Sequence, residues 1–189
     1  METNKIIEEL KAVAKLPVNP DQKHWLEQRA KDARPVECVR MRDVFTPDQL
    51  RFLSQNTGFK ARQKECYRNA ATLIDDVEWM AAHYDPAVSE LKYVEGFVYS
   101  LGLLPIEHAF VKIGDKYIDP TFERALHLDV RKEIYASCIE LDVKTMRKYL
   151  VETGYYGELY LYDYFLRFRP ELAERIRERN PHRNKIPAR

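Results

Sequence analysis

The chain has 189 residues, a length typical of one domain with a substantial hydrophobic core. Hydrophobic residues make up 45% and charged residues 32%, and the formal net charge of +1 gives no global reason to expect nucleic acid or a membrane surface as partner. Charges interrupt the apolar pattern at the N-terminus, and no apolar run approaches the roughly 18 residues of a membrane span, so we expect a cytoplasmic protein without a secretory signal.

Helical patterns dominate the first third of the chain. Apolar residues recur at helical spacing over 3–16 and stop before Pro17, and a short second helix is predicted from Pro20 to Leu26. A strand is predicted over 36–41. Thr46 followed by Pro47 is typical of a helix N-terminus and predicts a helix to about residue 54.

The next helix is predicted from about Gln63 to about His83. Its apolar positions step by four, three, four and three residues along one face: Cys66, Ala70, Leu73, Val77 and Met80. This spacing places Cys66 in the first turn of the helix and on its buried face.

After Pro86 the pattern changes to strands, which are predicted over 91–100, 107–113, 116–119 and 134–139. Asp142 caps a predicted helix that ends at Gly154, and a last helix runs from Pro170 to about residue 179. Residues 155–168 are rich in tyrosine, and their pattern does not select one structure. We expect a single domain over 1–180, followed by a basic tail over 181–189 that lacks the interleaved aromatics of single-strand binders.

A tight hairpin is predicted to bring a histidine and an aspartate together. Only Gly114 and Asp115 separate two strand patterns, which is typical of a II′ or I′ turn. If residue 113 faces 116, then 110 faces 119, and His108 and Asp119 become diagonal neighbours roughly 7 to 8 Å apart on one sheet face. A carboxylate in this position orients an imidazole that acts as a general base.

Cys66 is the candidate nucleophile. The backbone N–H groups and the positive end of the dipole at a helix start favour a thiolate, the reactive form. We expect the helix to dock on the sheet face that carries His108, while Ala109, Val111 and Ile113 face the core. Gln63 is the candidate for a second oxyanion donor beside the Cys66 N–H, and Gln55 is a weaker one.

Each of these residues also has a structural interpretation. A lone cysteine is more often a small core residue than a nucleophile, and a strand histidine or an Asp-Pro-Thr turn is uninformative alone. Their order along the chain and the shared hairpin face favour a triad of Cys66, His108 and Asp119.

The motifs around these residues resemble those of the transglutaminase-like branch of papain-fold cysteine enzymes. HAFVKIGDKYIDPTF at 108–122 resembles the segment in which His-Ala-aromatic opens one strand and Asp-Pro-Thr closes the next, and KECYRNA at 64–70 resembles the start of the nucleophile helix. The resemblance covers roughly residues 60–122. It implies Cys66 as nucleophile, His108 as general base and acid, and Asp119 as orienter.

Glu95 and Gly96 interrupt an otherwise apolar strand that should neighbour the hairpin. Gly96 is a candidate for close approach of a substrate backbone, and Glu95 for selecting a cationic or hydrogen-bond-donating group, although a solvent-facing glutamate is the commoner case. The cysteines form no CxxC pair, the histidines have no metal-ligand spacing and no glycine-rich phosphate loop is present. We therefore expect neither a metal nor a cofactor.

The sequence thus predicts an α+β fold of the papain/transglutaminase-like kind, with a nucleophile helix packed on an antiparallel sheet and flanking helices. The predicted function is that of a thiol-dependent hydrolase or acyltransferase, which acts through an acyl-enzyme on a protein, a peptide or a small acyl or amide substrate. The alternative is a catalytically inactive module of the same fold that binds a protein or peptide.

Overall fold

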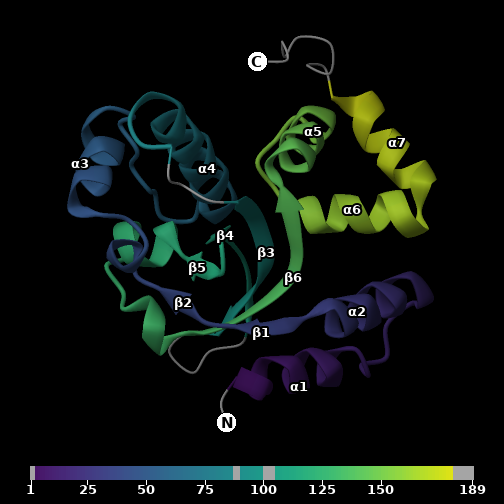
Figure 1. The fold of residues 1–189 in the computed structure, drawn as a ribbon. Coiled ribbons are helices and arrows are strands. Elements are labelled where there is room, and N and C mark those ends of the chain that lie inside the picture. The colour runs from purple at the N-terminus through teal and green to yellow at the C-terminus, as the bar shows by residue number, and fades with distance from the viewer. Residues whose placement is uncertain (1–2, 87–89, 100–104, 181–189) are drawn as a thin grey trace.

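The computed structural model describes residues 3–86, 90–99 and 105–180 (Figure 1). The predicted tail over 181–189 lies outside the described residues. The helices are α1 (Thr3–Val13), α2 (Pro20–Asp32), α3 (Pro47–Gln55), α4 (Cys66–His83), α5 (Val143–Thr153), α6 (Leu159–Phe168) and α7 (Pro170–Arg179). The strands are β1 (Arg34–Val36), β2 (Cys38–Val39), β3 (Leu91–Tyr99), β4 (Ile106–Ile113), β5 (Lys116–Ile118) and β6 (Ile134–Asp142).

Local signals account for several helix ends. The Thr46 side chain accepts a hydrogen bond from the Gln49 N–H at the start of α3, and Asp142 does the same for Thr145 at the start of α5. Gly154 ends α5 with φ of 79°, as predicted. The undecided segment 155–168 contains α6, whose tyrosines pack inward.

The sheet is mixed, whereas the sequence predicted an antiparallel one. Its strand order is β1-β6-β3-β4-β5-β2, and β2 runs parallel to β5. The single strand expected over 36–41 is instead two short strands separated by Glu37, one at each edge of the sheet. Four alternating strands lie between them, so β6 and β5 run in opposite directions. The segment that holds β1 and β2 therefore runs antiparallel to β6 and parallel to β5. Because this one short segment pairs with both strands, the sheet must curl to bring them towards each other.

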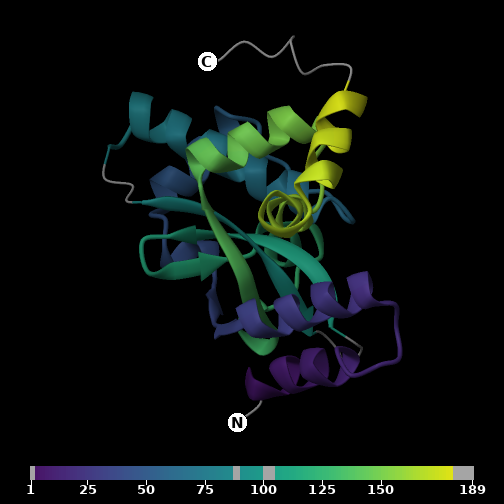
Figure 2. The same cartoon turned by 90° about the vertical axis from the view of Figure 1, so that its right-hand side faces the viewer.

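Helices cover the curled sheet on several sides. α3 and α4 lie together on one side in Figure 1, whereas α5, α6 and α7 form a second group and α1 and α2 a third. Figure 2 shows α1 alongside α2, at the end of the molecule opposite α5 and α7. The structure thus confirms an α+β fold with flanking helices around one continuous sheet.

The buried stripe of α4 packs on the face of β4 that presents Ala109, Val111 and Ile113. The expectation that α4 docks on the sheet face that carries His108 was wrong. The apolar residues of the helix bury more apolar surface when they pack against the opposite, apolar face of β4. His108 and Phe110 face the other way, towards Phe122 and Tyr135.

The hairpin between β4 and β5 has the predicted register. Ile113 pairs with Lys116, and Val111 pairs with Ile118. Gly114 has φ of 60° while Asp115 has no positive φ, which selects the II′ turn of the two predicted alternatives.

Candidate active site

His108 and Asp119 form a buried hydrogen-bonded pair. The Nε2 atom of His108 lies 2.7 Å from Oδ2 of Asp119, and the two side chains are 3% and 0% exposed. His108 comes from β4 and Asp119 follows β5 directly, so the hairpin register fixes their separation. The sequence predicted this pairing.

Asp119 is held by three further donors. Its Oδ1 accepts hydrogen bonds from the backbone N–H groups of Thr121 (2.9 Å) and Phe122 (3.1 Å), and its Oδ2 accepts one from the Tyr135 hydroxyl (2.9 Å). The two backbone bonds arise because the chain turns at Pro120 into a short π-helical turn, Thr121–Ala125. With every lone-pair direction occupied, the carboxylate and the imidazole have fixed orientations.

The third predicted residue reaches the same imidazole. Cys66 begins α4 and lies close enough to the His108 ring to affect its pKa. Because Nε2 of His108 is bonded to Asp119, Nδ1 is the ring nitrogen left to exchange a proton with the thiol. Burial would lower the pKa of His108, but the charge and hydrogen bond of Asp119, with smaller effects from Cys66, raise it to about 10. The imidazole is thus protonated at neutral pH.

Asn69 positions the chain that leads into Cys66. Its side-chain oxygen accepts from the Arg62 N–H (3.0 Å), and its amide nitrogen donates to the Arg62 carbonyl (2.7 Å) and to the Thr121 hydroxyl (2.9 Å). These bonds tie the segment before Cys66 to the turn that follows Asp119. Lys64 has a positive φ of 63°, which breaks the chain direction and makes α4 begin at Cys66 rather than near Gln63. The sequence analysis did not identify Asn69 as a site residue. The only indication in the sequence was that a polar residue lies beside the apolar face of the predicted helix.

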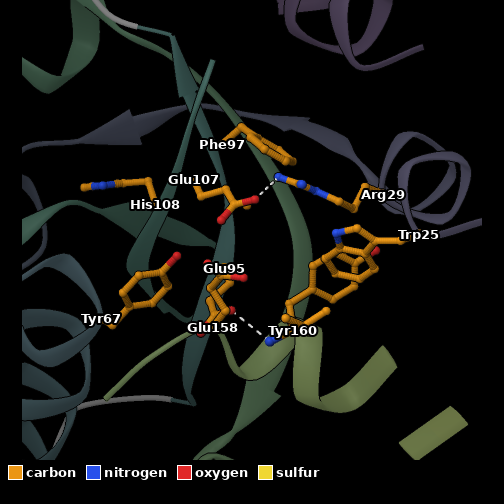
Figure 3. A pocket seen from close by; sticks show the side chains of 11 residues that line it. Trp25, Arg29, Tyr67, Glu95, Phe97, Glu107, His108, Glu158 and Tyr160 are labelled. Carbon is orange, nitrogen blue, oxygen red and sulfur yellow. Dashed lines mark hydrogen bonds and ion pairs between the residues drawn. The ribbon is translucent and has the colours of Figure 1, made fainter. Parts of the chain in front are cut away.

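A pocket of about 250 Å³, counting space open to solvent, adjoins the triad. His108, Glu95 and Gly96 line it, as does Tyr67, which follows Cys66; Cys66 itself does not line it. The opposite wall contains Trp25, Arg29 and Tyr160 (Figure 3). Two of the predicted site residues outside the triad therefore share one pocket with His108.

Glu95 is buried at 3% exposure, so the solvent-facing interpretation was wrong. Its carboxylate accepts hydrogen bonds from the N–H groups of Leu159 (2.8 Å) and Tyr160 (2.8 Å) at the start of α6, and from the Tyr93 hydroxyl (2.7 Å). It thus caps a helix whose own N-cap residue, Glu158, makes no side-chain capping bond. Burial outweighs these bonds and raises the pKa of Glu95 to about 8.

Gly96 is required by the sheet itself. A register shift between Glu95 and Gly96 brings β6 so close that a Cβ on Gly96 would lie 1.9 Å from the Ala136 carbonyl oxygen. The close approach predicted for a substrate backbone is thus made by a neighbouring strand.

The two candidate oxyanion glutamines lie away from this pocket. Gln63 is exposed, and its amide donates a long hydrogen bond of 3.5 Å to the Ala125 carbonyl. Gln55 is exposed at the end of α3. Neither side chain lines the pocket.

Three further charged residues of the pocket escaped sequence reasoning. Arg29 of α2 forms an ion pair with Glu107 of β4, and its guanidinium lies 4.4 Å from the ring centroid of Phe97. Burial and, to a smaller extent, the neighbouring Glu107 carboxyl group raise the pKa of Glu158 to about 7. Arg29, Glu107 and Glu158 are distant in sequence, so no local pattern connects them.

Burial raises the pKa of the other two thiols. Cys38 is buried, and burial raises its pKa well above the ordinary value; burial also raises the pKa of Cys138, to about 12.

Over the described residues, no three His, Cys, Asp or Glu side chains gather as a candidate metal site. In the same part of the chain, no helix has both the length and the apolar character that crossing a membrane requires.

Comparisons with protein-family models, with curated proteins and with solved structures found no match. The candidate site therefore has to be interpreted from its own geometry.

Proposed function

We propose that the protein is a thiol-dependent hydrolase or acyltransferase that attacks an amide, ester or thioester carbonyl through a covalent acyl-enzyme. The observation that carries this proposal is the buried His108–Asp119 hydrogen bond, together with the approach of Cys66 to the same imidazole. A thiol at a helix start, a protonated imidazole beside it and a buried carboxylate behind it form an activated cysteine nucleophile.

In the first half of the proposed reaction, the Cys66 thiolate attacks the carbonyl carbon and a C–S bond forms. The tetrahedral intermediate collapses as the bond to the leaving group breaks, and His108 gives its Nδ1 proton to that group. In the second half, neutral His108 takes a proton from water or an amine as it attacks the thioester. The C–S bond then breaks, which releases the product and restores the ion pair.

A place in the transglutaminase-like branch of papain-fold enzymes is part of the proposal. It is supported by the chain order of Cys66, His108 and Asp119, by the hairpin that joins the last two, and by a curled sheet against which the nucleophile helix packs. The pocket beside His108 is the proposed entrance for a protein, a peptide or a small acyl or amide substrate.

A screen of peptide, glutamine-amide and thioester substrates tests the proposal. Mass spectrometry of the stopped reaction should show an acyl adduct on Cys66, and Cys66→Ala should abolish both the adduct and turnover. Cys138→Ala is the matched control, because it removes a thiol that burial keeps protonated.

One observation favours a binding module as the second candidate. Cys66 does not line the pocket, so a ligand can occupy the pocket without touching the thiol. Under this alternative, a peptide that binds the protein would bind Cys66→Ala equally well, and no acyl adduct would form with any substrate class.

A further inference from the structure

Acyl transfer develops negative charge on the carbonyl oxygen, and enzymes of this kind place hydrogen-bond donors where that charge appears. The N–H of Cys66 is one such donor, because the first N–H groups of a helix lack intrahelical partners and the N-cap residue Glu65 makes no side-chain bond to them. The side-chain amide of the exposed Gln63 donates to the Ala125 carbonyl instead. A second donor has to come from elsewhere in the site.

Most polar groups of the pocket are already engaged. Arg29 is paired with Glu107, and the Tyr160 hydroxyl donates to Asp32 at 2.9 Å. Glu95 accepts three hydrogen bonds. Among the described residues, none forms a hydrogen bond with the Tyr67 hydroxyl, and Figure 3 shows this hydroxyl pointing into the pocket, towards the space between His108 and Glu95.

Tyr67 is also fixed in place. It is the second residue of α4, directly after Cys66, and its ring packs against the hydrophobic core beneath the helix. Burial, the charges of Glu95 and Glu158 and, to a smaller extent, Cys66 raise the pKa of Tyr67 above its ordinary value of 10. The hydroxyl therefore keeps its proton over the whole range in which proteins work and remains a donor.

We propose that Tyr67 is a catalytic residue whose hydroxyl donates a hydrogen bond to the carbonyl oxygen of the acyl group as that oxygen becomes an oxyanion. This inference rests on the proposed acyl-transfer function. It replaces Gln63 with Tyr67 as the second donor, beside the N–H of Cys66.

Two reactions of the same thiol separate this role from a structural one. Acylation of Cys66 by p-nitrophenyl acetate passes through an oxyanion, whereas alkylation by iodoacetamide is a direct displacement at carbon and does not. Tyr67→Phe should slow the p-nitrophenol burst by roughly 100-fold, the usual effect of removing one oxyanion donor, and leave the alkylation rate of Cys66 within about twofold. Tyr156→Phe is the control, because it removes the hydroxyl of a tyrosine outside the pocket whose ring lies under Arg68.

Equal burst rates in wild type and Tyr67→Phe would overturn the inference while leaving the proposed function intact. An equal loss of burst and alkylation would also overturn it, since Tyr67 would then act by shaping the nucleophile. A wild-type protein that is never acylated on Cys66 would overturn both the inference and the function on which it rests.

Discussion

Replacing Asp119 with asparagine tests how the buried pair controls His108. In Asp119→Asn, the side-chain oxygen can still accept the Thr121 and Phe122 N–H groups, so the turn after β5 is retained. The amide nitrogen, however, is a donor and faces Nε2 of His108, which must then give up its proton. The imidazole is forced into the Nδ1–H form, in which it cannot accept a proton from Cys66.

The size of the effect follows from the pKa of His108. Its rise from 6.5 to about 10 corresponds to about 5 kcal/mol of folding stability. Because the pKa is raised in the folded state, this stabilisation is complete below about pH 6.5 and is lost as the pH rises to about 10. We expect Asp119→Asn to lose most of it, since Asp119 contributes more to the rise than Cys66 does.

Urea unfolding followed by tryptophan fluorescence, at pH values from about 6 to about 10, measures this loss. The difference in unfolding free energy between wild type and Asp119→Asn should be largest near pH 6 and should shrink steadily towards pH 10. Turnover should fall by roughly 10⁴-fold, the cost of the wrong tautomer. Asp48→Asn, which removes an exposed carboxylate paired with Arg51, should show neither change. A difference in free energy that does not vary with pH would refute the reasoning.

Three further substitutions test the framework of the site. Glu95→Gln removes a carboxyl group whose pKa is raised from 4.5 to about 8, so the stability advantage of wild type over this variant should decline between those two pH values in the same unfolding assay, extended down to about pH 4.5. Gly96→Ala should destabilise the fold by about 3 kcal/mol or more, since its Cβ meets the Ala136 carbonyl; a variant with wild-type unfolding would contradict the close approach of β6. Asn69→Ala should cost about 2 to 3 kcal/mol and slow iodoacetamide alkylation of Cys66, whereas unchanged alkylation would show that the segment before Cys66 holds its position without Asn69.

Local sequence rules were sufficient to predict the half of the site that lies on the hairpin, the pair of His108 and Asp119. A two-residue turn at Gly114 and Asp115 leaves one register, and that register places His108 and Asp119 on one face. The capping residues Thr46 and Asp142 were predicted for the same reason, because each acts within one helical turn of its own position.

The rest of the site depends on contacts between distant segments. Asn69 is only a polar helix residue until Thr121 lies beside it, and Glu95 is an ordinary strand glutamate until the start of α6 reaches it. The curl of the sheet follows from β1 and β2 occupying opposite edges, which no single stretch of sequence indicates. Such pairings are set by the packing of the whole domain rather than by periodicity.

The alkylation rate of Cys66 as a function of pH tests the central claim most directly, with the labelled residue identified by mass spectrometry. If Cys66 and His108 form a thiolate–imidazolium pair, iodoacetamide should label Cys66 rapidly even well below about pH 8.5, the ordinary value for a free thiol, and His108→Ala should shift the profile up towards that value. A wild-type profile that rises only near pH 8.5, with Cys38 and Cys138 labelled as readily as Cys66, would contradict the claim.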